Sequence, residues 1–255
     1  MQRAPLPTCR LILTNMRLDV FLFENGHATS RTEAKQLILE SLVTVDGKVV
    51  TKASYDVEPG VTVNVADTGV RYASRGGRKL ECAIEAFDFE ITGRYAIDVG
   101  ASSGGFTDCL LKNGALQVIA VDSGTDQLVA SLRNDDRVTV MEGYNARYMT
   151  LSDLPYEPDL AVMDVSFISA TYIIPALYSC LKEGADFICL IKPQFEVGRA
   201  NIGKGGIVKD DKVRASAVNK VVDFAENIGF KTLGVTRSSV VGGDGNIEFL
   251  AHFKK

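Results

Sequence analysis

The sequence contains no tryptophan and only five cysteines in 255 residues. The number of cysteines is odd, no two of them form a C-x-x-C pair, and three lie in apolar surroundings: Cys109, Cys180 and Cys189. This pattern gives no support for a disulfide framework or for a metal site. We therefore expect these cysteines to be small buried hydrophobic side chains in a reducing compartment, and we expect no bound metal.

Long hydrophobic runs are also missing. No stretch reaches the roughly 18 apolar residues that a membrane helix needs. Residues 1–15 carry Arg3 and Arg10 but only one short apolar piece, residues 11–13, which makes a poor signal peptide. We therefore predict a cytoplasmic protein without membrane contact. Residues 1–15 are expected to be a disordered N-terminal extension or the product of an early start codon, since Met16 stands directly before the first patterned segment.

Neither sign of charge dominates the whole chain, but the two signs are unevenly distributed. The net charge is −4; residues 1–79 hold 11 Lys and Arg against 8 Asp and Glu, whereas residues 80–255 hold 17 against 24. A positive N-terminal part suits an anionic polymer such as RNA, although the excess is small.

Residues 16–66 show the pattern of a small helix–helix–hairpin module. Apolar residues between Leu18 and Leu22 predict a short helix, and a capping box at residues 30–33 predicts a second helix that continues to Ser41. Asp46-Gly47 lies between two short runs of valine and threonine, which favours a hairpin turn. Pro59-Gly60 predicts a further turn before a strand at residues 61–65.

Basic side chains recur through this module. Together with Asp19, the Ser30-Arg31 pair and residues 45–52, they make the segment resemble the RNA-binding domain first known from small-subunit ribosomal protein four. The resemblance implies that the second helix and the following loop contact RNA phosphates. A solvated basic helix face is the alternative. The candidate RNA-binding residues, including two from the segment that follows, are Arg17, Arg31, Lys35, Lys48, Lys52, Arg75 and Arg78.

Residues 67–79 form the predicted linker, and residues 80–255 form the predicted larger domain. Strands are expected at 95–99, 117–121, 138–141, 159–163, 186–191, 231–236 and 247–253, and helices from Leu80 and at 105–113, 125–132, 170–182 and 211–228. This alternation predicts an α/β fold with a seven-stranded, Rossmann-like sheet. The loop at residues 238–246 replaces a crossover helix, so the last strand should be antiparallel. A ligand should sit beyond the carboxyl ends of the strands.

The turn after the first strand of this sheet indicates the cofactor. Its glycines depart from the G-x-G-x-x-G pattern of dinucleotide sites, and Asp98 would repel a pyrophosphate but suit a cation. S-adenosylmethionine therefore fits better than NAD, and Asp122 stands where such folds hold a ribose diol. A glycine turn of any doubly wound sheet, with Asp98 as a helix cap, is the alternative. The candidate cofactor-binding residues are Asp98, Gly100, Ser102, Ser103, Gly104, Gly105, Phe106, Asp122, Asn145 and Asp164.

Opposite charges follow two buried strands: Asp164 ends one, and Lys192 ends another. A structural ion pair is one interpretation. The other is catalytic, because a ribose hydroxyl is a poor nucleophile whose proton a lysine could remove, or whose developing anion it could stabilise.

Five segments resemble the TlyA family, which is described as ribosomal RNA 2′-O-methyltransferases and also carries the name hemolysin A: residues 74–80, 98–108, 164–169, 191–196 and 245–249. In the predicted larger domain alone, the chain is also similar to the FtsJ-type ribose methyltransferases. The resemblance implies a catalytic tetrad of Lys79, Asp164, Lys192 and Glu248. Lys79 lies near the domain junction and could instead contact RNA. Tyr144 stands where the family has threonine, beside Asn145 in a loop expected near the adenine.

We therefore expect an S-adenosylmethionine-dependent enzyme that 2′-O-methylates ribosomal RNA, free or within ribosomal subunits. Two alternatives belong to other classes: a hemolysin-like protein that damages membranes, and a non-catalytic RNA-binding factor of ribosome assembly.

Overall fold

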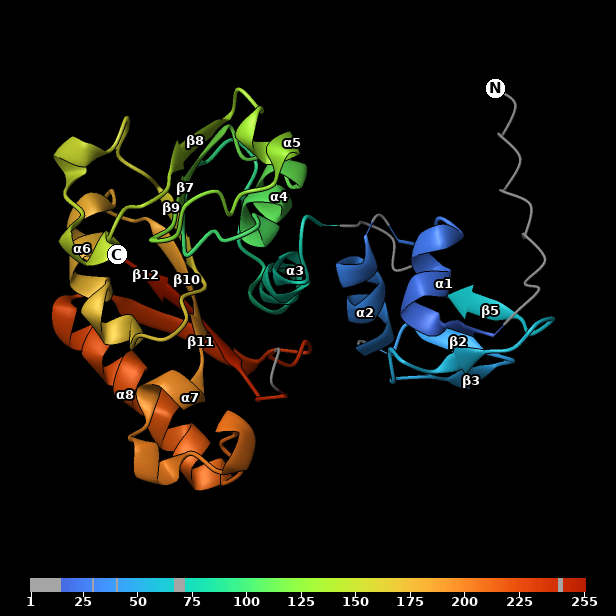
Figure 1. Cartoon of the computed structure of the whole chain (residues 1–255). Coiled ribbons are helices and arrows are strands. Elements are labelled where there is room, and N and C mark those ends of the chain that lie inside the picture. Colours follow the sequence, from blue (N-terminus) through green and yellow to red (C-terminus); the bar gives the residue numbers. More distant parts are fainter. Residues whose placement is uncertain (1–14, 29, 40, 67–71, 243–244) are drawn as a thin grey trace. The chain divides into compact units, whose positions relative to one another are not determined.

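The computed structural model describes residues 15–28, 30–39, 41–66, 72–242 and 245–255. The chain divides into a small unit, residues 1–70, and a large unit, residues 71–255 (Figure 1). The predicted extension, apart from Asn15, and residues 67–71 of the predicted linker lie outside the described residues.

The small unit has the predicted helix–helix–hairpin order. Helices α1 (Leu18–Glu24) and α2 (Arg31–Leu39) pack on a sheet of order β3-β2-β5, and a second pair, β1-β4, completes the unit. Asp46 and Gly47 both have positive φ, which suits the tight turn between β2 and β3. Helix α2 ends at Leu39, two residues before the predicted end at Ser41. The strands are β1 (Met16–Arg17), β2 (Val43–Val45), β3 (Lys48–Val49), β4 (Asp56–Val57) and β5 (Val63–Val65).

The large unit is built on one seven-stranded sheet of order β11-β12-β10-β9-β6-β7-β8. Strand β12 is antiparallel to both of its neighbours, and the other pairs are parallel, as the alternation of strands and helices predicts. The strands are β6 (Tyr95–Val99), β7 (Gln117–Val121), β8 (Val138–Met141), β9 (Leu160–Met163), β10 (Asp186–Ile191), β11 (Lys231–Arg237) and β12 (Phe249–Lys254).

Helices cover both faces of this sheet (Figure 1). Alternate strand residues point to opposite faces: Ala96 and Val118 pack with the helices α3, α4 and α5, whereas Ile97 and Ile119 pack with α6 and α8. Central strands are therefore apolar on both sides. Cys109, Cys180 and Cys189 are buried and free, as predicted. The helices are α3 (Gly76–Phe87), α4 (Gly105–Lys112), α5 (Ala130–Arg133), α6 (Ile174–Cys180), α7 (Pro193–Glu196) and α8 (Asp211–Ile228).

Two helix predictions in the large unit are wrong in extent. The helix predicted at 125–132 is a loop followed by the single turn of α5, because Asp126 has a positive φ of 55° and the N–H groups of residues 126–128 bond to the Glu142 carboxylate. The helix predicted at 170–182 is a 3-10 turn, Ala170–Tyr172, followed by α6. Helix α3 begins at Gly76, so Lys79 lies in its first turn.

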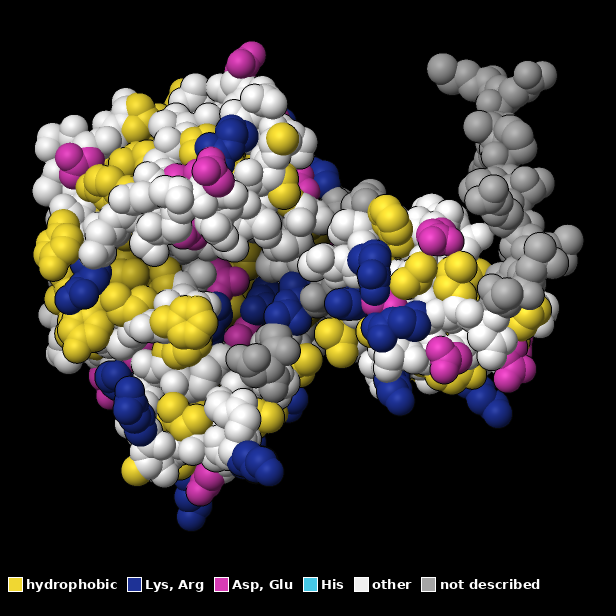
Figure 2. Space-filling view, viewed as in Figure 1, with side chains coloured by type: hydrophobic (Ala, Val, Ile, Leu, Met, Phe, Trp, Pro, Cys, Tyr) yellow, Lys and Arg dark blue, Asp and Glu magenta, His cyan; other side chains and the backbone are white. Residues whose placement is uncertain are grey.

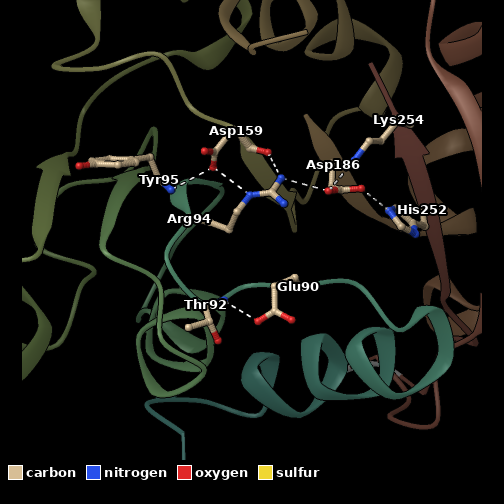
Figure 3. Close-up of polar contacts among 8 residues, drawn as sticks. All are labelled: Glu90, Thr92, Arg94, Tyr95, Asp159, Asp186, His252 and Lys254. Carbon is tan, nitrogen blue, oxygen red and sulfur yellow. Dashed lines mark hydrogen bonds and ion pairs between the residues drawn. The ribbon is translucent and has the colours of Figure 1, made fainter. Parts of the chain in front are cut away.

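A network of ion pairs lies at the end of the sheet where the parallel strands begin (Figure 3). Arg94 binds the carboxylates of Asp159 and Asp186 at 3.0 Å each, and Asp186 also binds His252 and Lys254 of β12. Burial alone would raise the pKa of Asp186, but hydrogen bonds from His252, Lys254 and Arg94 lower it to about 2. This network ties β6, β9, β10 and β12 together at the end of the sheet opposite the carboxyl ends of the parallel strands.

Candidate active site

The carboxyl ends of the parallel strands carry a row of charged side chains. Along this edge, Lys192 follows β10, Asp164 follows β9 and Asp122 follows β7. Glu248 joins them because it immediately precedes β12, which runs in the opposite direction. The chain builds β6, β7 and β8 in one direction and then returns to β9 on the other side of β6. Ligands of such sheets bind at this switch point.

Lys192 and Asp164 form an ion pair, with Nζ 2.5 Å from Oδ1. Lys192 also donates a hydrogen bond of 2.7 Å to the Ser166 hydroxyl. The two charged side chains are largely buried, being 10% and 19% exposed. Pro193 begins α7 directly after the lysine, so the chain turns away from the sheet and leaves the ammonium group beside the strand end.

Lys79 and Glu248 form a second ion pair, also with 2.5 Å between nitrogen and oxygen. Both side chains are almost completely buried, at 6% and 3% exposure. The β10–β12 ladder pairs Ile191 with Phe249, so its continuation places Lys192 opposite Glu248. The structure thus brings the four predicted catalytic residues together as two ion pairs at adjacent strand ends.

The glycine turn after β6 approaches the end of β9 closely. Gly100 has a φ of +85°, and a Cβ atom there would lie 2.5 Å from the carbonyl oxygen of Asp164. Only glycine combines this backbone conformation with this contact. Gly105 instead allows α4 to pack on α3, since a Cβ there would lie 2.8 Å from the Gly77 nitrogen.

Asp98, the penultimate residue of β6, is completely buried. Its Oδ2 accepts a 2.7 Å hydrogen bond from the Thr107 hydroxyl, and its Oδ1 has no partner among the described residues. Burial is the largest cause that raises its pKa, and the pKa reaches about 7 although the Thr107 bond acts in the other direction. The carboxylates of Asp164 and Asp122 contribute to the rise. Asp98 is therefore a buried acid whose pKa lies close to neutral pH.

Asp122 organises the loops beside this turn. Its carboxylate accepts hydrogen bonds from the backbone nitrogens of Ser102, at 2.8 Å, and Gly124, at 2.7 Å. Its carbonyl accepts one from Tyr144, which brings the loop of Asn145 to the same end of the sheet. Asn145 itself caps a short turn through the nitrogen of Arg147. Asp122 and Asn145 thus lie on loops that are joined to each other.

The remaining predicted cofactor residues pack against other parts of the protein. The Phe106 side chain is buried in the core with α3 and α4, so it faces the protein interior. The Ser103 carbonyl accepts a hydrogen bond from Val129, and Gly104 packs on Leu132. The turn from Gly100 to Ser102 is therefore the part of the predicted set that stands at the strand ends.

Sequence reasoning missed two residues of this edge. Glu142 accepts three backbone hydrogen bonds from residues 126–128 and forms an ion pair with Arg133. The hydrogen bond from Arg133 is the largest cause that lowers the pKa of Glu142 to about 2. Phe167 is 92% exposed, has a φ of +65° and lies 5.2 Å from the Phe195 ring, centroid to centroid. The position of Phe167 within the Asp164 motif was the available signal, whereas the partners of Glu142 are distant in sequence.

In the small unit, two predicted RNA-binding arginines share one buried acid. Arg17 and Arg31 each bind the Asp19 carboxylate at 3.0 Å, and the hydrogen bond from Arg17 is the largest cause that lowers the pKa of Asp19 to about 2. Lys35, Lys48 and Lys52 are exposed. Figure 2 shows basic side chains on the visible face of this unit. The remaining two candidates, Arg75 and Arg78, belong to the large unit at the start of α3.

In the part of the chain that the structure describes, no group of three or more His, Cys, Asp or Glu side chains is arranged to hold a metal ion. Over the same residues, no helix has both the length and the apolar character needed to span a bilayer.

The order of the sheet fits the fold of the S-adenosylmethionine-dependent methyltransferases, and the family comparison shows that class. The chain belongs to the FtsJ-like methyltransferase family, whose family model matches residues 72–255, and it also carries an S4 domain, matched at residues 16–63.

The similarity to known relatives covers most of the chain. The 16S/23S rRNA (cytidine-2′-O)-methyltransferase TlyA of Mycobacterium tuberculosis is 42% identical over 91% of this chain and 87% of its own length. Hemolysin A of Brachyspira hyodysenteriae is 41% identical over 93% and 99%. A solved structure titled "Putative hemolysin from Streptococcus thermophilus" has a TM-score of 0.75 and 42% identity, covering 96% of this chain and 90% of its own.

Proposed function

We propose that this protein transfers a methyl group from S-adenosylmethionine to a ribose 2′-hydroxyl of ribosomal RNA. The observation that carries the proposal is the pair of buried lysine–carboxylate contacts at adjacent strand ends, beside the switch point of the sheet. The name of the mycobacterial relative supports the same reaction and substrate.

The residues at the switch point fit the proposed cofactor. Asp98 offers a buried carboxylate oxygen without a partner among the described residues, which a cationic ligand would compensate. Gly100 keeps the turn close to Asp164, and Asp122 stands at the next strand end, where a ribose diol is held in such folds. We propose that these residues, with the loop of Asn145, hold S-adenosylmethionine. When bound, it supplies an electrophilic methyl group.

We assign the reaction step to Lys192. Its ammonium group is fixed by Asp164 and Ser166, so its position is set before RNA binds. From there the ammonium would donate a hydrogen bond to the ribose 2′-oxygen and stabilise the negative charge that develops on that atom; after it has released a proton to water, the neutral amine could instead accept the 2′-hydroxyl proton. Lys79 and Glu248 would keep the neighbouring strand end electrically balanced, because each lysine of the two pairs faces one carboxylate.

We propose that RNA is held by both units. Asp19 orients the guanidinium groups of Arg17 and Arg31, and exposed lysines lie on the same unit, which suits phosphate contacts. In the large unit, Phe167 presents an exposed ring three residues after Asp164, where a base adjacent to the reacting ribose could stack. A ribosomal RNA substrate also implies that the protein works in the cytoplasm.

The proposal is tested by incubating the protein with S-adenosylmethionine carrying a labelled methyl group and with ribosomal RNA or ribosomal subunits. A methylated 2′-oxygen cannot attack the neighbouring phosphate, so the label should appear in dinucleotides that resist alkaline hydrolysis. Label in bases, or no label under conditions in which the protein binds the cofactor, would overturn the proposal. The latter result would favour a non-catalytic RNA-binding factor.

A further inference from the structure

Glu196 is a buried acid beside the candidate active site that the proposed reaction does not use. It is the last residue of α7, four residues after Lys192, and its side chain is only 2% exposed. The residue therefore shares with Lys192 the short segment that follows β10.

Both carboxylate oxygens of Glu196 bind other elements. Oε1 accepts a 2.7 Å hydrogen bond from the backbone nitrogen of Ala170, and Oε2 accepts a 2.5 Å bond from the Ser169 hydroxyl. Lys220 of α8 donates to Oε2 at 3.1 Å and to the Glu196 carbonyl at 3.0 Å. Glu196 therefore joins α7, the turn that starts at Ala170, and α8.

These contacts close a ring with the ion pair of the active site. The loop from Asp164 to Ser169 follows β9, and the segment from Lys192 to Glu196 follows β10. The two are joined at one end by Lys192 with Asp164, and at the other end by Glu196 with Ser169. Because both ends are held, the relative position of Lys192 and Asp164 depends on Glu196.

The conformation of the loop gives an independent reason for such a fixed point. Phe167 lies in the middle of the loop and has a φ of +65°, which a bulky non-glycine residue seldom adopts. A conformation of this kind persists only where the surrounding structure holds it. The Glu196 bonds to Ser169 and Ala170 lie directly after this strained position.

The Glu196 carboxylate does more than fill space. Burying a charge is costly, and the hydrogen bonds from Ser169 and Ala170 that compensate this charge also fix the end of the Asp164 loop. The only cation that binds Glu196 among the described residues is Lys220, whose side chain is 46% exposed.

We infer that Glu196 is a positioning residue for the methyl-transfer reaction: through Ser169 and Ala170 it holds the Asp164 loop against Lys192. This inference rests on the proposed function. It predicts that loss of Glu196 acts mainly on the reaction step and leaves the binding of S-adenosylmethionine nearly unchanged.

The test compares Glu196→Ala, Glu196→Gln and Ser169→Ala in the full-length protein. Glu226→Ala serves as the control, because Glu226 is an exposed acid on α8. Single-turnover methylation, the Kd for S-adenosylmethionine, the KM for RNA and the melting temperature are measured for each. Displacement of a catalytic group by about 1 Å can cost about 10²-fold in rate. We therefore expect Glu196→Ala to lower the single-turnover rate about 10- to 100-fold, with the Kd for S-adenosylmethionine within about twofold of the parent and the KM for RNA raised by less than the rate falls, because Phe167 lies on the same loop.

Glu196→Gln keeps one oxygen that can accept the Ala170 bond, so it should restore part of the rate. A folded Glu196→Ala protein with the parent kcat would overturn the inference, as would losses of cofactor binding and melting temperature that match the loss of rate. If Glu196→Ala does not fold, Ser169→Ala decides: a lower kcat at unchanged Kd supports the inference, and the parent kcat refutes it. A parent protein that binds cofactor but methylates no RNA would instead contradict the proposed function.

Discussion

Replacing Asp98 by asparagine should raise the stability of the fold and weaken the binding of S-adenosylmethionine. The carboxyl is completely buried, and its pKa rises from 3.8 to about 7. A rise of this size corresponds to about 4 kcal/mol of preference for the neutral form. An asparagine has no charge to bury, and its amide oxygen can still accept the hydrogen bond from Thr107.

The sign of the pH dependence follows from proton binding. Between the unfolded pKa and the native pKa, the native state holds a proton that the unfolded state has released, so the parent loses stability as pH rises. This loss accumulates from about pH 4 to about pH 7 and is constant above. The stabilising effect of Asp98→Asn should therefore be about 2.5 kcal/mol larger at about pH 8 than at about pH 5.

Urea unfolding of the parent and Asp98→Asn at these two pH values measures the effect, and Asp136→Asn, at an exposed acid, is the matched control. Calorimetry at about pH 8 should show S-adenosylmethionine affinity weakened at least about tenfold by Asp98→Asn, because a buried charge partner is lost. An equal change in stability at both pH values would refute the buried-acid argument. Unchanged cofactor affinity would remove Asp98 from the binding site.

Three further predictions concern other parts of the molecule. Gly100→Val should abolish detectable S-adenosylmethionine binding, because its Cβ would lie 2.5 Å from the Asp164 carbonyl oxygen; calorimetry giving the parent affinity would show that the turn can shift. The double variant Arg31→Ala with Lys35→Ala should lower the slope of log RNA affinity against log salt concentration by the equivalent of about two phosphate contacts. An unchanged slope in filter binding would mean that this helix face is merely solvated. Asp186→Asn should lose about 2 kcal/mol of unfolding free energy at neutral pH, with the difference from the parent disappearing as pH falls through about 2; equal urea midpoints at neutral pH would contradict the stabilising role of the network.

Much of the fold follows from local sequence patterns. All seven strands of the large unit lie within a few residues of their predicted positions, because the buried strands are short apolar runs bounded by turns and helices and β11 alternates exposed and half-buried residues. The antiparallel β12 followed from the absence of a crossover helix. The errors occur where a side chain distant in sequence determines the backbone conformation. The Glu142 carboxylate accepts hydrogen bonds from the N–H groups of residues 126–128, which were predicted to be helical.

The candidate site was predictable to a similar degree. Asp164 and Lys192 could be placed because each directly follows a strand, and parallel strand ends meet at one edge of the sheet. The partnership of Lys79 with Glu248 joins residues 169 positions apart, so residue spacing gave no signal for it and only the family resemblance did. Glu196 was not predicted, because its role depends on Ser169 and Ala170, which the sequence separates from it by a helix and a strand.

Lys192, held by Asp164, is the residue that we propose acts in the reaction step. The most direct test is single-turnover methylation of ribosomal RNA by Lys192→Ala, after its fold and cofactor affinity have been confirmed. We predict a fall in rate of about 10² to 10⁴ with S-adenosylmethionine affinity nearly unchanged, and no rescue by Lys192→Arg, because a guanidinium stays protonated and has a different shape. A Lys192→Ala protein that methylates at the parent rate would contradict the claim.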